Sequence, residues 1–119
     1  MTVFFGMLYA HLIADWLLQT EFQACGKSKG KFFNMASVSH GATHAVCLVM
    51  ALWWTGAAIA WAFPIVLSHI FIDRRWPVTW WIIHVERTRP ETLEALWWLP
   101  IAVDQVMHLT IIGIVALCQ

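Results

Sequence analysis

Residues 36–54 read ASVSHGATHAVCLVMALWW, an apolar stretch without a single charged side chain. A helix needs about 20 such residues to cross the hydrocarbon core of a bilayer. His40 and His44 lie inside the stretch, four positions apart. Residues at this spacing lie above one another on one helix face, so both imidazoles point in the same direction. The stretch therefore predicts a membrane-spanning helix that presents two histidines to its neighbours.

Composition extends this prediction to the whole chain. Of the 119 residues, 61% are hydrophobic and 12% are charged, which is typical of a membrane protein with several spans. Further apolar stretches cover residues 3–19, 56–72 and 96–117. We therefore predict an all-α fold, a single domain over residues 1–119 with four transmembrane helices in a compact bundle. Thr55 and Gly56 are the only break between the second and third stretches, so these two should form a tight helical hairpin.

The basic residues predict the orientation of the chain. All seven fall in the two loops that lie on the same side of a four-span protein: Lys27, Lys29, Lys31, Arg74, Arg75, Arg87 and Arg89. By the positive-inside rule, this side is cytoplasmic and both termini are outside. The net charge is zero and the basic residues form short clusters, so the pattern does not indicate nucleic-acid binding. We interpret these basic residues as charges that set the topology of the chain.

The second basic loop, residues 74–90, is more than a linker. Trp76, Trp80 and Trp81 form an aromatic, apolar part, and Glu86 and Arg87 begin a charged end. Aromatic side chains next to charges are typical of segments that lie in the membrane interface. We expect a short interfacial segment between the third and fourth spans.

Ionisable residues occur inside all four apolar stretches. An ionisable side chain in hydrocarbon costs about 2.5 to 3.5 kcal/mol on insertion scales, so such residues indicate a functional site. They form four pairs at the same spacing: His11/Asp15, His40/His44, His69/Asp73 and Asp104/His108. In the predicted orientation, all four pairs lie toward the cytoplasmic end of their helices. The sequence therefore predicts one site with eight candidate ligands.

Imidazole nitrogen and carboxylate oxygen are ligands for divalent metals. Zinc is the first expectation, and manganese, iron and nickel also suit these donors. The three cysteines have no paired spacing, which argues against a zinc knuckle. Eight ligands suit two ions with a bridging carboxylate, as in some helical bundles. They equally suit one ion whose histidines are oriented by the remaining carboxylates.

Hydrolysis is the reaction class that such a site predicts. A bound metal lowers the pKa of water and polarises a phosphoryl or acyl oxygen. Asp15, Asp73 or Asp104 would act as general base, and Arg74 and Arg75 would hold an anionic head group. The depth of the site points to a lipid or lipid-linked phosphate or ester at the cytoplasmic leaflet.

Two other functions stay open at this stage. The same residues would serve a proton or metal-ion transporter or channel, although the outer halves of the spans offer few polar groups to continue the path. A non-catalytic membrane module, for example a phage-encoded effector or partner-binding protein, would use the ion to hold the bundle together. Four short helices bury little surface, so a homo-oligomer is plausible in each case. In a simpler interpretation, the polar residues only form hydrogen bonds between helices.

Four segments also resemble a known family. They are HLIADWLLQT (residues 11–20), HGATH (40–44), HIFID (69–73) and DQVMH (104–108). In this order they resemble the family of small bacterial and phage inner-membrane proteins called domain of unknown function 3307. The resemblance implies that the protein is located in a bacterial cytoplasmic membrane. A more distant similarity to membrane-bound metal-dependent hydrolases implies hydrolase activity by analogy.

Overall fold

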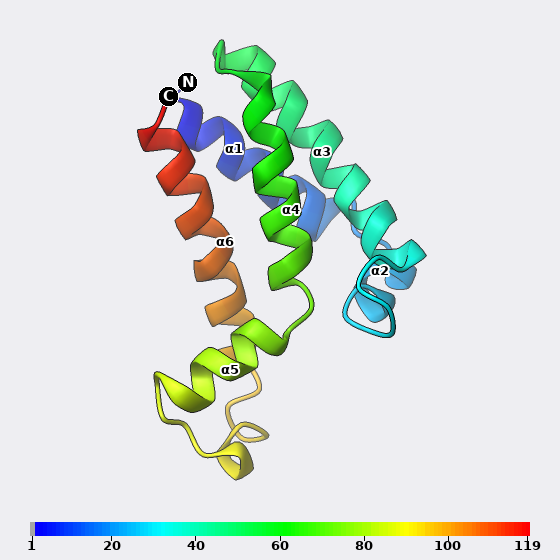
Figure 1. Ribbon diagram of the computed structural model, residues 1–119, viewed down its shortest axis with the longest axis vertical. Coiled ribbons are helices and arrows are strands. Elements are labelled where there is room, and N and C mark those ends of the chain that lie inside the picture. Colours follow the sequence, from blue (N-terminus) through cyan, green and yellow to red (C-terminus); the bar gives the residue numbers. More distant parts are fainter. Residues whose placement is uncertain (1) are drawn as a thin grey trace.

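The computed structural model describes residues 2–119, and these residues contain helices and no strand, as predicted (Figure 1). The elements in chain order are α1 (Val3–Leu12), η1 (Ile13–Leu17), α2 (Glu21–Gly26), α3 (Met35–Thr55), η2 (Ile59–Trp61), α4 (Ala62–Ile72), α5 (Trp76–His84), η3 (Pro90–Thr92) and α6 (Leu99–Leu117). α1 continues directly into the π-helical turn η1, so the first apolar stretch is helical through Leu17.

Local signals set the ends of α3, the longest helix. The Asn34 side chain accepts a hydrogen bond from the backbone N–H of Ser37 and caps the first turn. At the other end, Gly56 has a φ of 74°, a left-handed conformation that glycine adopts without steric cost. The helix therefore spans the quoted stretch with one more residue at each end.

The helices of the third and fourth predicted spans, α4 and α6, begin later in the sequence than expected. Residues 56–58 form a turn in which Ala58 is extended, and the 3₁₀ turn η2 precedes α4. The turn is needed because α4 runs back along α3. Its residues were predicted to belong to a helix that starts at position 56. In the fourth stretch, α6 begins at Leu99 rather than at residue 96, with Pro100 in its first turn, where a missing N–H costs nothing.

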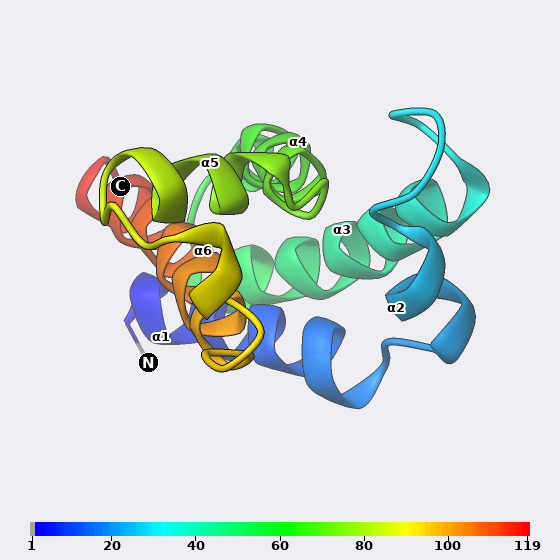
Figure 2. The ribbon, with the colours of Figure 1, turned by 90° about the horizontal axis from the view of Figure 1, so that it is seen from below.

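A short helix, α2, lies in the first basic loop, where no helix was expected. It starts with a capping box, in which the Thr20 hydroxyl accepts from the Gln23 N–H and the Gln23 side chain accepts from the Thr20 N–H. Figure 2 shows α2 beside the first turns of α3.

Helices α1, α3, α4 and α6 form the bundle, and both chain ends lie together at its upper end (Figure 1). The two basic loops lie at the opposite end. They touch through Arg74, whose guanidinium donates hydrogen bonds to loop carbonyl oxygens of Lys27, Lys29, Gly30 and Lys31. Both loops therefore occupy the same end of the bundle.

Above the polar pairs, the bundle interior is apolar. The buried cluster contains Met7, Leu48, Leu52, Ile65 and Ile112, which come from all four bundle helices. Burying such side chains is the main stabilising contribution to the packing. This cluster fills the space between the polar pairs and the end of the bundle that carries the termini.

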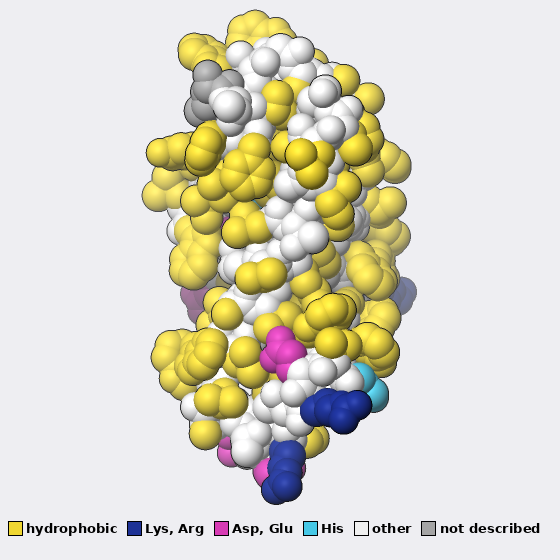
Figure 3. Space-filling view, turned by 90° about the vertical axis from the view of Figure 1, so that its left-hand side faces the viewer, with side chains coloured by type: hydrophobic (Ala, Val, Ile, Leu, Met, Phe, Trp, Pro, Cys, Tyr) yellow, Lys and Arg dark blue, Asp and Glu magenta, His cyan; other side chains and the backbone are white. Residues whose placement is uncertain are grey.

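The outer surface is also apolar over most of its height. Figure 3 shows hydrophobic side chains over the upper and middle parts of one face, with charged groups gathered toward the lower end. Two helices, α3 with 21 residues and α6 with 19, are long and apolar enough to cross a membrane. The apolar segments Val3–Leu17 and Ile59–Ile72 are shorter. The structure therefore supports two candidate spans, and the four-span arrangement stays a prediction.

The segment 74–90, which was predicted to be interfacial, contains the helix α5, which lies across the lower ends of α4 and α6 (Figures 1 and 2). Val78 and Ile82 face inward and are buried. Trp76, Trp80 and Trp81 are exposed. The helix thus has one face toward the bundle and an aromatic face outside.

Candidate metal centre

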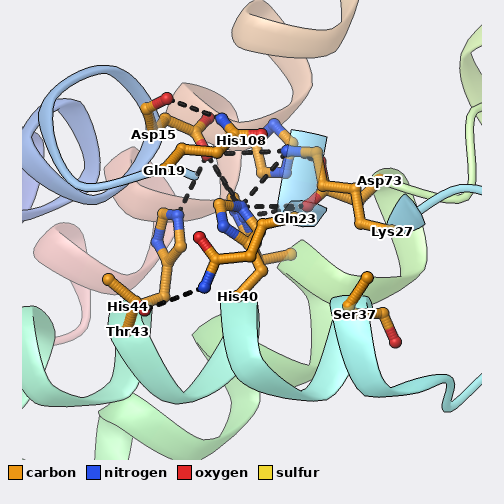
Figure 4. Close-up of polar contacts among 12 residues, drawn as sticks. Asp15, Gln19, Gln23, Lys27, Ser37, His40, Thr43, His44, Asp73 and His108 are labelled. Carbon is orange, nitrogen blue, oxygen red and sulfur yellow. Dashed lines mark hydrogen bonds and ion pairs between the residues drawn. The ribbon is translucent and has the colours of Figure 1, made fainter. Parts of the chain in front are cut away.

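The four predicted pairs meet in the lower half of the bundle, and Figure 4 shows several of their side chains converging. α1 and η1 supply His11 and Asp15, α3 supplies His40 and His44, α4 with the residue after it supplies His69 and Asp73, and α6 supplies Asp104 and His108. All of these side chains are buried except that of Asp104, which is 21% exposed. Four helices therefore deliver polar groups to one interior region.

Asp15 reaches this region from the π-helical turn. The N–H of Leu18 donates to the carbonyl of Ile13, five residues back, so the turn is wider than an α-helical one. The Gln19 side-chain amide donates to the Asp15 carbonyl at 2.6 Å, which satisfies a backbone acceptor at the helix end. Such π turns occur frequently at functional sites. The widened turn ends the helix with the Asp15 carboxylate directed at α3.

Four of the candidate ligands form one compact group. Asp15 Oδ1 lies 3.0 Å from His40 Nε2, 3.1 Å from His44 Nε2 and 3.6 Å from His69 Nε2. The Nε2 atoms of His40 and His69 are 3.1 Å apart, and ligand atoms of all four residues lie within 4.8 Å of one another. With bonds of about 2.0–2.1 Å, the corners of a tetrahedron around zinc lie about 3.3 Å apart. Four of the six distances within the group are close to this value, so the group can accommodate a tetrahedral metal site.

His40 shows why hydrogen bonding alone does not account for this packing. Its Nε2 has four close polar neighbours: Asp15 Oδ1 at 3.0 Å, His69 Nε2 at 3.1 Å, Lys27 Nζ at 3.2 Å and Asp73 Oδ2 at 3.3 Å. A ring nitrogen either donates one proton or accepts through one lone pair. Most of these neighbours therefore cannot be its hydrogen-bond partners. Apart from the Lys27 ammonium, the crowded atoms are imidazole nitrogens and carboxylate oxygens, which are the donor atoms that would surround a shared cation.

A second group contains His69, Asp73 and His108, with ligand atoms again within 4.8 Å. Three buried polar atoms among the described residues lack a hydrogen-bond partner, namely His40 Nδ1, Asp73 Oδ2 and His108 Nε2. All three belong to predicted ligands. The second group shares His69 with the first, so the two groups together contain six of the eight predicted ligands.

His11 and Asp104 surround the ligand group without joining it. The His11 Nε2–H donates to Gln105 Oε1 at 3.2 Å, and the Gln105 amide donates to Asp15 Oδ2 and to Asp104 Oδ2, both at 3.2 Å. Gln105 therefore bridges α6 to α1 and orients the Asp15 carboxylate. Second-layer contacts of this kind hold metal-binding carboxylates in place.

Lys27 is a member of the site that the sequence pattern did not predict. Lys27 was interpreted as a topogenic charge, yet its Nζ lies 3.1 Å from Asp73 Oδ1 and 3.7 Å from Asp15 Oδ1, and its side chain is only 12% exposed. A usable signal was present, because the capping box at Thr20 and Gln23 predicts a helix on which Lys27 follows Gln23 by four residues.

Asp73 is the first residue after α4 and carries a negative charge. Burial raises the pKa of its carboxyl, but the imidazoles of His40 and His69 and the Lys27 ammonium outweigh burial and hold the pKa below its usual range. An ionised carboxylate beside two imidazoles is a suitable environment for a cation.

The two arginines next to Asp73 differ in position. The Arg74 guanidinium is engaged by the backbone of residues 27–31, so its hydrogen-bonding groups serve the loop. Arg75 lines a cavity beside the site. Of the two predicted head-group residues, Arg75 has the position that this role requires.

This cavity has a volume of about 410 Å³ and adjoins the carboxylate side of the ligand group. Its polar lining contains Asp15, Asp73, Asp104, Lys27, Arg75, Gln19, Gln105 and Thr79, and its other lining residues are Trp16, Ala24, Val78, Pro100 and Ile101. No histidine is among the lining residues that the structure describes. The imidazoles therefore hold one side of the site, and all three aspartates face the cavity.

Comparison with known protein families identifies a family to which the chain belongs. The family model described as "Protein of unknown function (DUF3307)" matches residues 3–119, nearly the whole chain, which confirms the resemblance of the four motifs. No curated protein and no solved structure matches the chain at a significant level.

Proposed function

The chain belongs to the DUF3307 family, and we propose that it is a membrane protein that binds a divalent metal ion and hydrolyses a lipid phosphate or ester. The observation that carries the proposal is the convergence of Asp15 Oδ1 with Nε2 of His40 and His69 and with the His44 imidazole, at distances suited to tetrahedral coordination. A group of three imidazoles and one carboxylate in an apolar bundle favours zinc, and it also suits manganese, iron or nickel.

The surface supports a membrane location. Exposed aromatic and aliphatic side chains cover the bundle, and charged groups gather at the end with the basic loops (Figure 3). In the proposed arrangement, four helices span a bacterial cytoplasmic membrane, both basic loops are cytoplasmic, and the tryptophans of α5 lie in the interface. The site then lies near the cytoplasmic leaflet.

The cavity supports hydrolysis as the reaction. A bound ion would supply an activated water and polarise the substrate oxygen. Asp73 and Asp104 line the cavity from two sides, so either carboxylate can accept the proton of the attacking water. Arg75 offers a cation for a phosphate, and Trp16 and Ile101 offer apolar surface for a lipid chain. The water oxygen bonds to phosphorus or to the acyl carbon while the bond from that atom to the leaving oxygen breaks, and the leaving alkoxide takes the proton that the carboxylate accepted from the water.

A second candidate function rests on the number of ligands. Four protein ligands complete a tetrahedron, which is the pattern of structural zinc sites, whereas catalytic sites keep a position open. In a non-catalytic module, the ion would join η1, α3 and α4 and would not react. For hydrolysis, the Asp15 carboxylate must leave the ion or the ion must accept a fifth ligand.

A transporter or channel receives less support. Ion or proton transfer across the bundle would need polar groups on both sides of the site. Between the site and the termini, the described interior is the apolar cluster around Met7, Leu48 and Ile112.

The test is metal content, measured by plasma mass spectrometry on protein purified in detergent without chelator. We expect one equivalent of a transition metal in the wild type and none in His44→Ala. His84→Ala is the matched control, because His84 is exposed on α5, away from the site, and should keep the ion. Wild-type protein that holds no metal, and does not take it up on reconstitution, would refute the proposal.

A further inference from the structure

The ammonium of Lys27 lies among the candidate metal ligands. Its Nζ is 3.1 Å from Asp73 Oδ1, 3.2 Å from His40 Nε2 and 3.7 Å from Asp15 Oδ1 (Figure 4). Two buried carboxylates close together need cationic partners, since an unpaired buried charge is strongly unfavourable. Lys27 supplies such a charge at the centre of the group.

The backbone that carries Lys27 is anchored from several directions. The Gln23 side-chain amide donates to the hydroxyls of Ser39 and Thr43 on α3. Arg74 donates to the Lys27 carbonyl, and the Asn34 amide donates to the Gly26 carbonyl. These bonds hold the start of the Lys27 side chain beside the site. The position of the ammonium is therefore a feature of the fold.

A metal ion bound by His40 and Asp15 would stand directly beside this ammonium. Two cations at such short range repel each other strongly, and both use the same carboxylates. From these contacts we propose that Lys27 is an internal counter-ion that competes with the metal for Asp15 and Asp73, so that metal binding displaces its ammonium into the adjoining cavity. This inference rests on the metal site proposed above.

The adjoining cavity can accommodate the displaced ammonium. Lys27 also lines the 410 Å³ cavity, and its flexible side chain lets the charged end move while the backbone remains anchored. Lys27 and Arg75 both line this cavity, so the metal-loaded protein presents two cations to an anionic group. Metal binding therefore increases the positive charge in the cavity and favours the binding of an anionic head group.

The first test follows the wild-type protein. Full-length protein in detergent is treated with a limiting amount of an amine-reactive reagent, metal-free and saturated with zinc, and modified lysines are quantified by mass spectrometry. We expect modification of Lys27 to rise several-fold with zinc, because its ammonium leaves the carboxylates. Lys29 and Lys31 are exposed on the same loop and serve as internal controls that should not change. Unchanged Lys27 modification at full zinc occupancy overturns the proposal.

The second test measures zinc affinity by competition with a chelating dye. Lys27→Gln removes the competing charge and should bind zinc about tenfold more tightly than the wild type. Lys31→Gln, the control, should bind as the wild type does. Equal or weaker affinity in Lys27→Gln overturns the competition. Should that variant not fold, the labelling of the wild type decides alone. A wild type without any zinc binding refutes the proposed function itself, a result separate from either outcome for Lys27.

Discussion

The Nε2 atoms of His40 and His69 lie 3.1 Å apart, although the two residues are 29 positions apart in the chain and on different helices. The contact depends on the close approach of α3 and α4. At Gly41, beside His40, a Cβ atom would lie 2.7 Å from Ile70 Cδ1, beside His69. The absence of a side chain at Gly41 therefore allows the two helices to bring their imidazoles together.

Replacing Gly41 should damage the site through packing alone. Gly41→Val places a branched side chain against Ile70 and pushes α4 away from α3, which costs about 1–3 kcal/mol of stability by overpacking. We expect a lower thermal midpoint and weaker zinc binding. Gly113→Val on α6 is the matched control, since a Cβ there meets no atom within 4 Å. Zinc affinity at the wild-type level in Gly41→Val would show that helix spacing does not control the site.

Removal of the metal should destabilise the wild-type protein. An ion that binds the folded chain and not the unfolded chain adds its binding free energy to stability. A strong chelator should therefore lower the thermal midpoint of the wild type in detergent, and zinc should restore it. His44→Ala should already melt at the lower temperature and should not respond to either treatment. Equal responses of the two proteins would contradict a site that contains His44.

The loop contacts of Arg74 predict a local effect. Arg74→Gln removes the guanidinium that donates to the carbonyl oxygens of residues 27–31. Charge-assisted hydrogen bonds contribute about 1.5–3 kcal/mol each when buried, and less here because most of these are exposed. We expect faster amide hydrogen exchange in residues 27–34 and a modest loss of stability. Arg75→Gln should leave exchange unchanged, because the described hydrogen bonds to these loop carbonyls come from Arg74 and Asn34 and not from Arg75.

A substitution of Asp104 tests the proposed hydrolysis separately from metal binding. It lines the cavity but is outside the four-ligand group. Asp104→Asn should keep the metal and reduce hydrolysis of lipid phosphates or esters about 10²–10⁴-fold if Asp104 is the general base. Asp15→Ala, in contrast, should lose the ion. Full activity of Asp104→Asn would transfer the role of base to Asp73, which the corresponding Asp73→Asn variant then tests.

Two native cysteines test the orientation in the membrane. Cys25 is exposed on α2 at the end with the basic loops, and Cys118 is exposed just after α6 at the opposite end. In variants that retain one cysteine each, a membrane-impermeant thiol reagent should label Cys118 in intact spheroplasts and Cys25 only after lysis. The reverse pattern would place the basic loops outside and remove the proposed site from the cytoplasmic leaflet.

Much of the architecture was predictable because the signals are local. Apolar length and composition predicted an all-helical chain, and α3 differs from the quoted stretch by one residue at each end. The spacing of four predicted that His40 and His44 share a helix face, since this geometry depends on the helix alone. The capping box of α2 is an equally local signal.

Other features depend on contacts between segments far apart in the chain. Lys27 approaches Asp73 because α2 packs on α3 and Arg74 binds the loop, and neither contact has a periodic signature in the sequence. The same holds for Gln105, which reaches His11 and Asp15 across the bundle.

The sequence by itself determined which helices form and which polar residues share a face, because both follow from hydrogen bonding and geometry within one helix. Only the tertiary structure decided that Asp15, His40, His44 and His69 form the ligand group while His11 and Asp104 surround it. That division depends on helix rotation and spacing, which are set by side-chain packing such as Ile70 against Gly41 and by the widened turn at Asp15.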